Sequence, residues 1–184
     1  KIVWDQHELD DFYLSGRLRP AIYKVLCLGC DDIIMANRYR QRYVGINLNI
    51  PKNKMHYLNN FPDKIFLQKT KNDIPNPDQK WLNGADFMLA QGGAIPGRNI
   101  KQLVDTFAQK ETNCKLIIIG PYTDHIYEYV NHRLPKISKQ RIRFTGSINQ
   151  MDIIPYIDHA KASIVMYRKE NVNSTLCAPN KLYQ

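Results

Sequence analysis

Phe87-Met88-Leu89-Ala90-Gln91-Gly92-Gly93-Ala94-Ile95-Pro96-Gly97-Arg98 is the stretch of sequence that decides the fold. An apolar run opens it, as in a buried strand, and a glycine-rich turn from Gly92 to Gly97 follows. Beyond the turn, a helix is expected from about Arg98, because apolar residues recur there at helical spacing. These residues are Ile100, Leu103, Val104 and Phe107. Strand, turn and helix together form one unit of a parallel α/β sheet.

The glycine turn has two interpretations. Backbone amides at the start of a helix lack partners and the helix dipole adds positive potential, so an anion binds there readily. Glycines also let a phosphate approach the backbone closely, and Arg98 adds a bidentate phosphate donor. Alternatively, this is an ordinary turn that needs glycine for positive φ. Taken alone, the turn favours neither interpretation.

The rest of the second half continues the alternation of strands and helices. Strands are expected at residues 115–119, 141–145 and 162–166, and Pro179 is typical of the first turn of a further helix. Lys181 would lie in that first turn, where a cation is unfavourable unless an anion is present. Because the carboxyl ends of parallel strands share one edge, the turns after them would bring Arg98 and Lys181 to one diphosphate.

The first part of the chain shows the same alternation less cleanly. Strands are expected at residues 2–4, 32–36 and 56–60, and Asn37 is a good cap for a helix that runs to Tyr43. Another helix follows Pro20, with its apolar side formed by Ile22, Val25 and Leu26.

Residues 61–83 separate the two series and are rich in Pro, Asn, Asp and Lys, with little periodicity. Such a composition is typical of a linker. We therefore expect a first α/β domain over residues 1–62, a linker over 63–83 and a second α/β domain over 84–184. Both ends of the chain are abrupt, so both domains are expected to be incomplete.

The net charge of +9 indicates an anionic partner, for which nucleic acid, an acidic membrane surface and a nucleotide diphosphate all qualify. A solvated basic surface is an equally good explanation. Basic residues bunch only at residues 38–42 and 136–143, which disfavours nucleic acid. Tyr39 and Tyr43 could stack on single-stranded nucleic acid beside the neighbouring arginines, but a solvated helix face is favoured.

No apolar run approaches the roughly 20 residues that a membrane-spanning helix needs. Cys27 and Cys30 form a lone Cys-x-x-Cys without the second ligand pair that a structural zinc requires. They lie in an apolar stretch that predicts a buried helix, so core packing is the favoured role. Few cysteines without a framework fit a reducing, cytoplasmic compartment.

Together, these segments resemble the retaining, family-4-type (group 1) glycosyltransferases of the GT-B fold. Gly92-Gly93-x-x-Pro-Gly-Arg-Asn resembles the start of their donor domain, and Leu116 to Gly120, Arg143 to Ile148 and Pro179 to Tyr183 match that domain in order and spacing. Trp4 to Glu8, Cys30 to Ile34 and Asn60 to Asp63 resemble segments of the acceptor domain. The resemblance covers most of the chain and implies two Rossmann-like domains.

The resemblance implies transfer of a hexose from a nucleotide-diphosphate sugar to a glycan or lipid-linked acceptor, with retention of configuration and without a metal. Arg98 and Lys181 would bind the diphosphate with backbone amides near Gly93, and the turns after Gly120 and Gly146, including Ile148, would hold the base. His7 would be the catalytic residue in the cleft near the sugar. The donor is a substrate, and no tightly bound cofactor is expected. Such an enzyme would serve polysaccharide or glycolipid assembly in the cytoplasm, in peripheral contact with the anionic inner face of the membrane.

One position departs from the family. A glutamate that binds the donor ribose usually follows the Asn-Lys-Leu-aromatic run, and Gln184 stands there instead. Glutamine bonds hydroxyls without the charge that strengthens such bonds. Two alternatives therefore stay open: a nucleotide-sugar 2-epimerase of the same fold, and a non-catalytic GT-B-like protein that binds an anionic partner through its basic surface.

Overall fold

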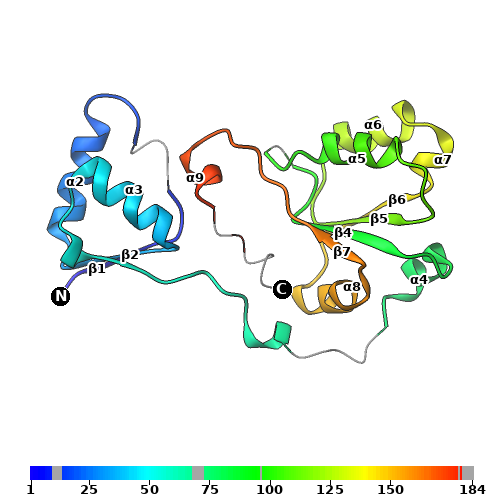
Figure 1. Cartoon of the computed structure of the whole chain (residues 1–184), viewed down its shortest axis with the longest axis horizontal. Helices are drawn as coiled ribbons and strands as arrows, with labels where there is room; N and C mark the ends of the chain where they lie inside the picture. Colours follow the sequence, from blue (N-terminus) through cyan, green and yellow to red (C-terminus); the bar gives the residue numbers. More distant parts are fainter. Residues whose placement is uncertain (10–13, 68–72, 96, 178, 180–184) are drawn as a thin grey trace. The chain divides into compact units, whose positions relative to one another are not determined.

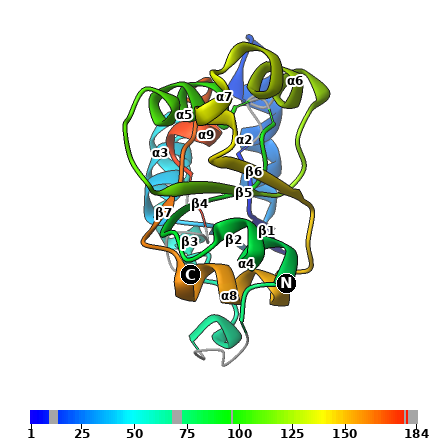
Figure 2. The ribbon, with the colours of Figure 1, turned by 90° about the vertical axis from the view of Figure 1, so that its right-hand side faces the viewer.

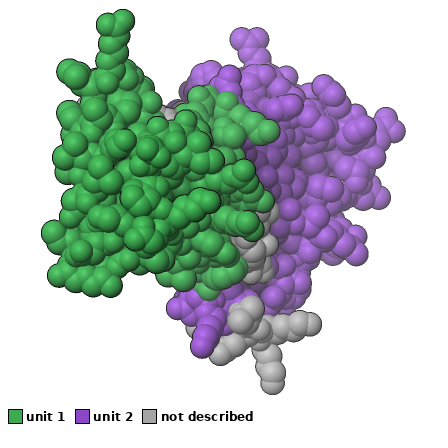
Figure 3. All heavy atoms as spheres, turned by 60° about the vertical axis from the view of Figure 1, so that its left-hand side comes forward, with its two compact units in different colours: residues 1–62, 169–183 green, residues 63–168, 184 purple. Residues whose placement is uncertain are grey.

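The computed structural model describes residues 1–9, 14–67, 73–95, 97–177 and 179 of the chain. The chain divides into two compact units, coloured separately in Figure 3. Unit 1 comprises Lys1–Pro62 with Lys169–Tyr183, and unit 2 comprises Asp63–Arg168 with Gln184. Each unit holds one parallel sheet, so the predicted α/β class is confirmed. The sequence division assigns residues 169–183 to the second domain, whereas contacts group them with the first unit.

Unit 1 is a three-stranded parallel sheet in the order β1-β2-β3, with two longer helices (Figure 1). Its elements are β1 (Val3–Gln6), α2 (Arg19–Gly29), β2 (Asp32–Met35), α3 (Arg38–Leu48), β3 (Met55–Tyr57) and the short α9 (Val172–Thr175). Asn37 caps α3 as predicted, since its side chain accepts a hydrogen bond from the Arg40 amide. The helix runs five residues beyond the predicted end at Tyr43.

Helix α2 packs on the sheet through a different stripe from the predicted one. Tyr23 and Cys27 are buried, whereas Ile22, Val25 and Leu26 are 56%, 68% and 47% exposed. Ile22 and Leu26 are spaced one helical turn apart, and so are Tyr23 and Cys27, so periodicity could not choose between the two apolar stripes. The predicted burial of Cys27 and Cys30 is confirmed, and all four cysteines are free thiols. Burial raises the pKa of Cys27 to about 11, as expected for a thiol that serves in packing.

Unit 2 is a four-stranded parallel sheet in the order β6-β5-β4-β7, covered on both faces. Its strands are β4 (Phe87–Gln91), β5 (Lys115–Ile119), β6 (Ile142–Gly146) and β7 (Ala162–Ile164), and its helices are α4 (Asn76–Leu82), α5 (Ile100–Ala108), α6 (Asp124–Arg133), α7 (Lys136–Lys139) and α8 (Ile154–His159). Figure 2 shows α5, α6 and α7 on one face of the sheet and α4 and α8 on the other. Strands β4 and β5 coincide with the predicted strands, because each is a continuous apolar run covered on both sides.

Helix α4 lies within the stretch that the sequence analysis interpreted as a linker, and it belongs to the core of unit 2. Leu82 packs with Phe87 and Tyr156 beneath the sheet. The carboxylate of Asp78 accepts a hydrogen bond from the Tyr156 hydroxyl and forms an ion pair with Arg143 of β6. Burial, together with the bond to Asp78, raises the pKa of Tyr156. This buried network fastens α4 to the sheet and to α8.

Replacement of Asp78 by alanine is expected to lower the free energy of unfolding of unit 2 by about 3 kcal/mol, because it leaves a buried hydroxyl and a half-buried guanidinium without their partner. Asp86→Ala is the matched control, since Asp86 pairs with Lys161 at the surface and such a pair contributes at most about 1 kcal/mol. Denaturant unfolding followed by Trp81 fluorescence in a Trp4→Phe background measures both. Equal losses in the two variants would contradict the network's role.

Candidate functional site

The turn after β4 is fastened to the turn after β5 by backbone hydrogen bonds. The amides of Gly92 and Gly93 both donate to the carbonyl of Ile119 at 2.9 Å, and the Ala94 amide donates to the Pro121 carbonyl at 2.8 Å. The Gly93 amide, predicted to help hold the diphosphate, is therefore engaged within the protein. Donors for an anion have to come from further along the turn.

Gly93 and Gly120 are required by the close approach of these two turns. Gly93 has φ +80°, and a β-carbon built on it would lie 2.2 Å from the carbonyl oxygen of Pro121. Gly120 has φ +123°, and its β-carbon would lie 2.5 Å from the Gly93 nitrogen. Real β-carbons do not approach backbone atoms so closely, so both positions exclude any side chain. The two glycines thus pack the carboxyl ends of β4 and β5 together.

Gly93→Ala is expected to destabilise unit 2 by roughly 3 kcal/mol or more, since the backbone of one turn must move. Gly84→Ala separates this steric cost from that of positive φ: Gly84 has φ +75°, but a β-carbon added there would meet no heavy atom within 4 Å. The control should cost about 1 kcal/mol. Thermal unfolding followed by Trp81 fluorescence compares the two, and similar losses would show that the turns are not in tight contact.

Arg98 is held on an aromatic ring that follows the last strand of the sheet. Its guanidinium lies over the ring of Tyr167, with Cζ 4.0 Å from the ring centroid. The neighbouring Arg168 amide donates to the Gly97 carbonyl at 2.8 Å, which draws the segment after β7 onto the turn. Among the described residues, none provides a carboxylate partner for Arg98. A stacked guanidinium keeps its N–H donors free at the ring's edge, so Arg98 is positioned to bind an anion.

Helix α5 begins at Ile100, two residues later than predicted, with Asn99 as its N-cap at φ 52° and without a side-chain cap bond. A groove of about 710 Å³ opens beside this helix start and that of α6. Residues from both helices, the turn and the segment after β7 line it, among them Gly97, Lys101, Asp105, Thr123, His125 and Arg168. Among the described residues that line the groove, Asp105 is the single carboxylate, and it is paired with Lys101 at 2.8 Å. Although burial acts in the opposite sense, bonds from Lys101 and Tyr129 hold the pKa of Asp105 below its ordinary value.

The structure brings several of the predicted site residues together. Gly92, Gly93 and Gly120 share the interlocked turns, and the Gly120 amide donates to the Gly146 carbonyl at 2.9 Å. Ile148 follows that glycine and packs partly buried against the core beneath the sheet. The carboxyl ends of the four strands lie at one edge, as predicted from the parallel alternation, although β7 ends two residues before the predicted end at Met166.

Two predicted site residues, Lys181 and Gln184, lie outside the described residues. Tyr167 was missed by the sequence analysis, and the only signal for it was an aromatic residue shortly after a buried strand. Within the described part of the chain, no group of three or more His, Cys, Asp or Glu side chains is arranged to hold a metal ion.

His7 lies in unit 1 at the end of β1. Its Nε2 is 3.3 Å from Asp5 Oδ2, and both side chains are more than half exposed. The backbone beneath it is held by Arg40, whose buried guanidinium donates to the His7 carbonyl. Arg40 Nε also donates to the Leu176 carbonyl at 3.1 Å, and its Nη2 lies 3.3 Å from Glu8 Oε2. Arg40 therefore ties the loop that carries His7 to the returning segment around α9.

Arg40→Met is expected to lower the free energy of unfolding of unit 1 by about 3 kcal/mol, since the carbonyls of His7, Leu176 and Asn173 lose a charged donor. Arg42→Met, at an exposed position of the same helix, should change it by less than about 0.5 kcal/mol. Fluorescence of Trp4, which packs edge-on against Tyr23, follows unfolding in a Trp81→Phe background. A loss of stability in both variants alike would indicate a general charge effect instead.

The chain has the fold of known glycosyltransferase structures. HepE of Anabaena, solved in complex with UDP and glucose, matches with a TM-score of 0.65 and 16% identity, over 89% of this chain and 46% of its own. A glycosyltransferase from Rickettsia africae matches with a TM-score of 0.66 and 12% identity, over 89% and 44%. The UDP-forming trehalose-phosphate synthase of Burkholderia vietnamiensis matches with a TM-score of 0.63 and 7% identity, over 82% and 41%.

The predicted resemblance to GT-B glycosyltransferases is therefore confirmed at the level of the fold. The chain spans less than half the length of each of these structures. No protein-family model and no curated protein sequence matches it. Among the described helices, none combines the length and apolar character needed to cross a membrane.

Proposed function

We propose that unit 2 binds the nucleotide diphosphate of a sugar donor at the edge where its four strands end. Arg98 carries this proposal: it is stacked on Tyr167, lacks a carboxylate partner among the described residues and lies beside the start of α5. Further support is that HepE, a protein of the same fold, was solved in complex with UDP and with UDP-glucose. Similarity of fold alone does not carry a substrate across, so the argument rests on the site itself.

The chemistry proposed is sugar transfer with retention, to a glycan or lipid-linked acceptor. Departure of the nucleotide diphosphate develops negative charge on its phosphates, and fixed cations stabilise that charge without reorganising. Arg98 would supply one such cation, and Lys181 a second by the family resemblance. The uncapped amides at the start of α5 would add donors in the place of the engaged Gly93 amide. In this proposal His7 acts near the sugar, Ile148 and the turn at Gly120 hold the base, and Gln184 bonds the ribose.

UDP is expected to stabilise unit 2 against thermal unfolding by about 1.4 kcal/mol at ten times its dissociation constant. Arg98→Gln should weaken UDP binding about tenfold, because a charge-assisted bidentate contact is lost. Arg133→Gln, which removes an exposed charge near the end of α6, is the matched control and should bind as the parent does. Unfolding followed by Trp81 fluorescence against UDP concentration gives both constants.

Two results would count against the proposal. One is UDP binding that Arg98→Gln leaves unchanged, and the other is equal stabilisation by inorganic phosphate, which would indicate a simple anion site. Incubation with the donor alone then separates the two enzymatic alternatives, since only a 2-epimerase converts the donor without an acceptor. Binding without turnover of any donor would favour the non-catalytic alternative.

A further inference from the structure

Three consecutive residues after β1, from His7 to Leu9, are each fastened to another part of unit 1. The Leu9 side chain is 2% exposed and packs into the core, and its amide donates to Asn173 Oδ1 at 2.9 Å. Glu8 Oε2 accepts a bond from the Asn173 amide group and lies 3.3 Å from Arg40 Nη2. The His7 carbonyl accepts a bond from Arg40. The His7 imidazole, by contrast, is 65% exposed.

Asn173 holds this loop with both halves of its side chain. The carbonyl oxygen accepts from the Leu9 amide, and the amino group donates to Glu8. A carboxylate in its place could accept but not donate, and an apolar side chain could do neither. Asn173 lies on α9, whose start is fixed by a capping box between Asn171 and Ser174. The residue type at position 173 therefore matches the two bonds that the loop requires.

Arg40 holds the same loop from α3. Burial of a guanidinium is costly, and only well-formed bonds offset that cost. Among the described residues, the acceptors of the Arg40 side chain lie in two segments, the loop after β1 and residues 173–176. Its Nη2 also lies 3.3 Å from the Asn173 carbonyl oxygen, so the two residues that hold the loop contact each other. The planar guanidinium fixes the directions of these bonds, which a flexible ammonium would not do.

The clamp formed by Arg40 and Asn173 determines where the His7 ring lies. His7 Nε2 is 3.3 Å from Oδ2 of Asp5, which belongs to β1 and is fixed by the pairing of that strand with β2. The strand thus fixes Asp5 and the clamp fixes His7, so the distance between their side chains depends on both. Groups that take part in a reaction have to be held within about 0.5 Å of their productive position. An exposed ring on a loop meets this requirement only if its backbone is fixed.

We propose that Arg40 and Asn173 are positioning residues for His7 and keep its exposed imidazole in one orientation. This inference rests on the proposed function, in which His7 acts near the sugar. Neither residue touches the donor, and both act through the backbone of the loop. The chain reaches α9 shortly after Tyr167, so one returning segment supplies both the ring that stacks on Arg98 and half of the clamp on His7.

Nuclear magnetic resonance of the 184-residue chain gives two site-resolved measurements. Hydrogen exchange of the Leu9 amide reports the bond to Asn173, and ¹³C relaxation of the His7 ring reports its order on the picosecond to nanosecond timescale. In the parent, the His7 ring is expected to be well ordered in spite of its exposure. His132, an exposed histidine near the end of α6, is the internal reference for a mobile ring.

Asn173→Ala is expected to speed exchange of the Leu9 amide about tenfold, since its acceptor is lost. The order of the His7 ring should fall toward that of His132. Arg40→Lys keeps the charge but replaces the planar fork with a compact ammonium, so it should lower the order of the same ring. A conservative variant with this effect would show that bond geometry, and not charge, holds His7.

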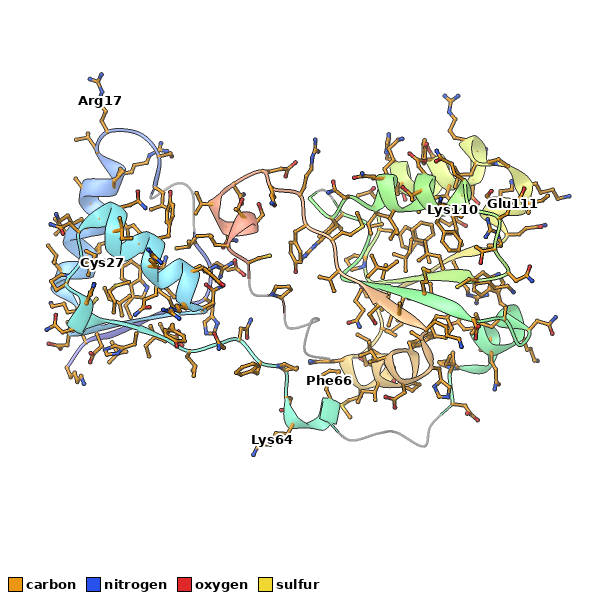
Figure 4. The ribbon with its side chains drawn as sticks, in the orientation of Figure 1. Arg17, Cys27, Lys64, Phe66, Lys110 and Glu111 are labelled. Atoms are coloured by element: carbon orange, nitrogen blue, oxygen red, sulfur yellow. The ribbon has the colours of Figure 1, made fainter. Side chains whose placement is uncertain are left out.

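Two controls separate positioning from general stability. Ile50→Val removes one methylene from a side chain that is 5% exposed in the same core, so it loosens unit 1 without removing a bond to the loop. Arg17→Lys makes the same change as Arg40→Lys at a side chain that projects away from α2 (Figure 4). Both should leave the His7 ring and the Leu9 amide as they are in the parent.

An ordered His7 ring that both clamp variants loosen and both controls leave intact supports the proposal. It is overturned if the ring in the parent is as mobile as that of His132, or if the clamp variants leave its order unchanged. It is also overturned if Ile50→Val loosens the ring as much as Asn173→Ala does. Neither measurement uses a donor, so a failure of the clamp is distinct from a failure of UDP to bind unit 2.

Discussion

The contact between Gly93 and the backbone at Gly120 and Pro121 sets the geometry of the whole strand edge in unit 2. With two α-carbons facing backbone atoms directly, the turns after β4 and β5 lie closer than any side chain would allow. The Gly120 bond to Gly146 extends the same arrangement to the turn after β6. The segment that follows β7 is drawn in by the bond between Arg168 and Gly97. Four turns from distant parts of the sequence thus meet, and Arg98 is held among them.

This contact changes the meaning of a glycine-rich turn. Glycine is often assumed to make room for a ligand's phosphate, but here the room is taken by the neighbouring turn. The amides of Gly92 and Gly93 serve the fold, and anion binding falls to a side chain and to the start of a helix. This separation of roles has a physical advantage. The glycines make the strand edge rigid, and a rigid edge holds Arg98 in place before any ligand binds.

The fold was predictable where the physical signal is local. Strands β4 and β5 were located to the residue, since each is a short, mostly apolar run that glycine follows directly. The position of helix α2 along the chain was predicted correctly, but its buried face was not. Two faces of the helix are apolar, and the packing against the sheet determines which of them is buried. Helix α4 was missed because Asp78 and Tyr156, which hold it, are far apart in sequence.

The candidate site was predictable in the same measure. Arg98 and the two glycines could be found from their spacing, but the stacking of Tyr167 on Arg98 depends on the return of the chain after β7. The basic run at residues 38–42 was limited in the same way, because the sequence does not show which of its three arginines is buried. The packing of the loop at His7 and of the segment around Leu176 sets Arg40 apart from its neighbours.

That returning segment has a consequence for how the protein is made. Unit 1 is assembled from two stretches of chain with residues 63–168 between them, so the first stretch is synthesised before the Leu176 and Asn173 carbonyls that Arg40 bonds. Domains usually fold in the order of their synthesis. Here the continuous stretch of residues 63–168 can fold first, and unit 1 is completed only when α9 has been synthesised. A nascent chain halted before α9 would hold Arg40 without its Leu176 and Asn173 partners and would be a natural target for chaperones.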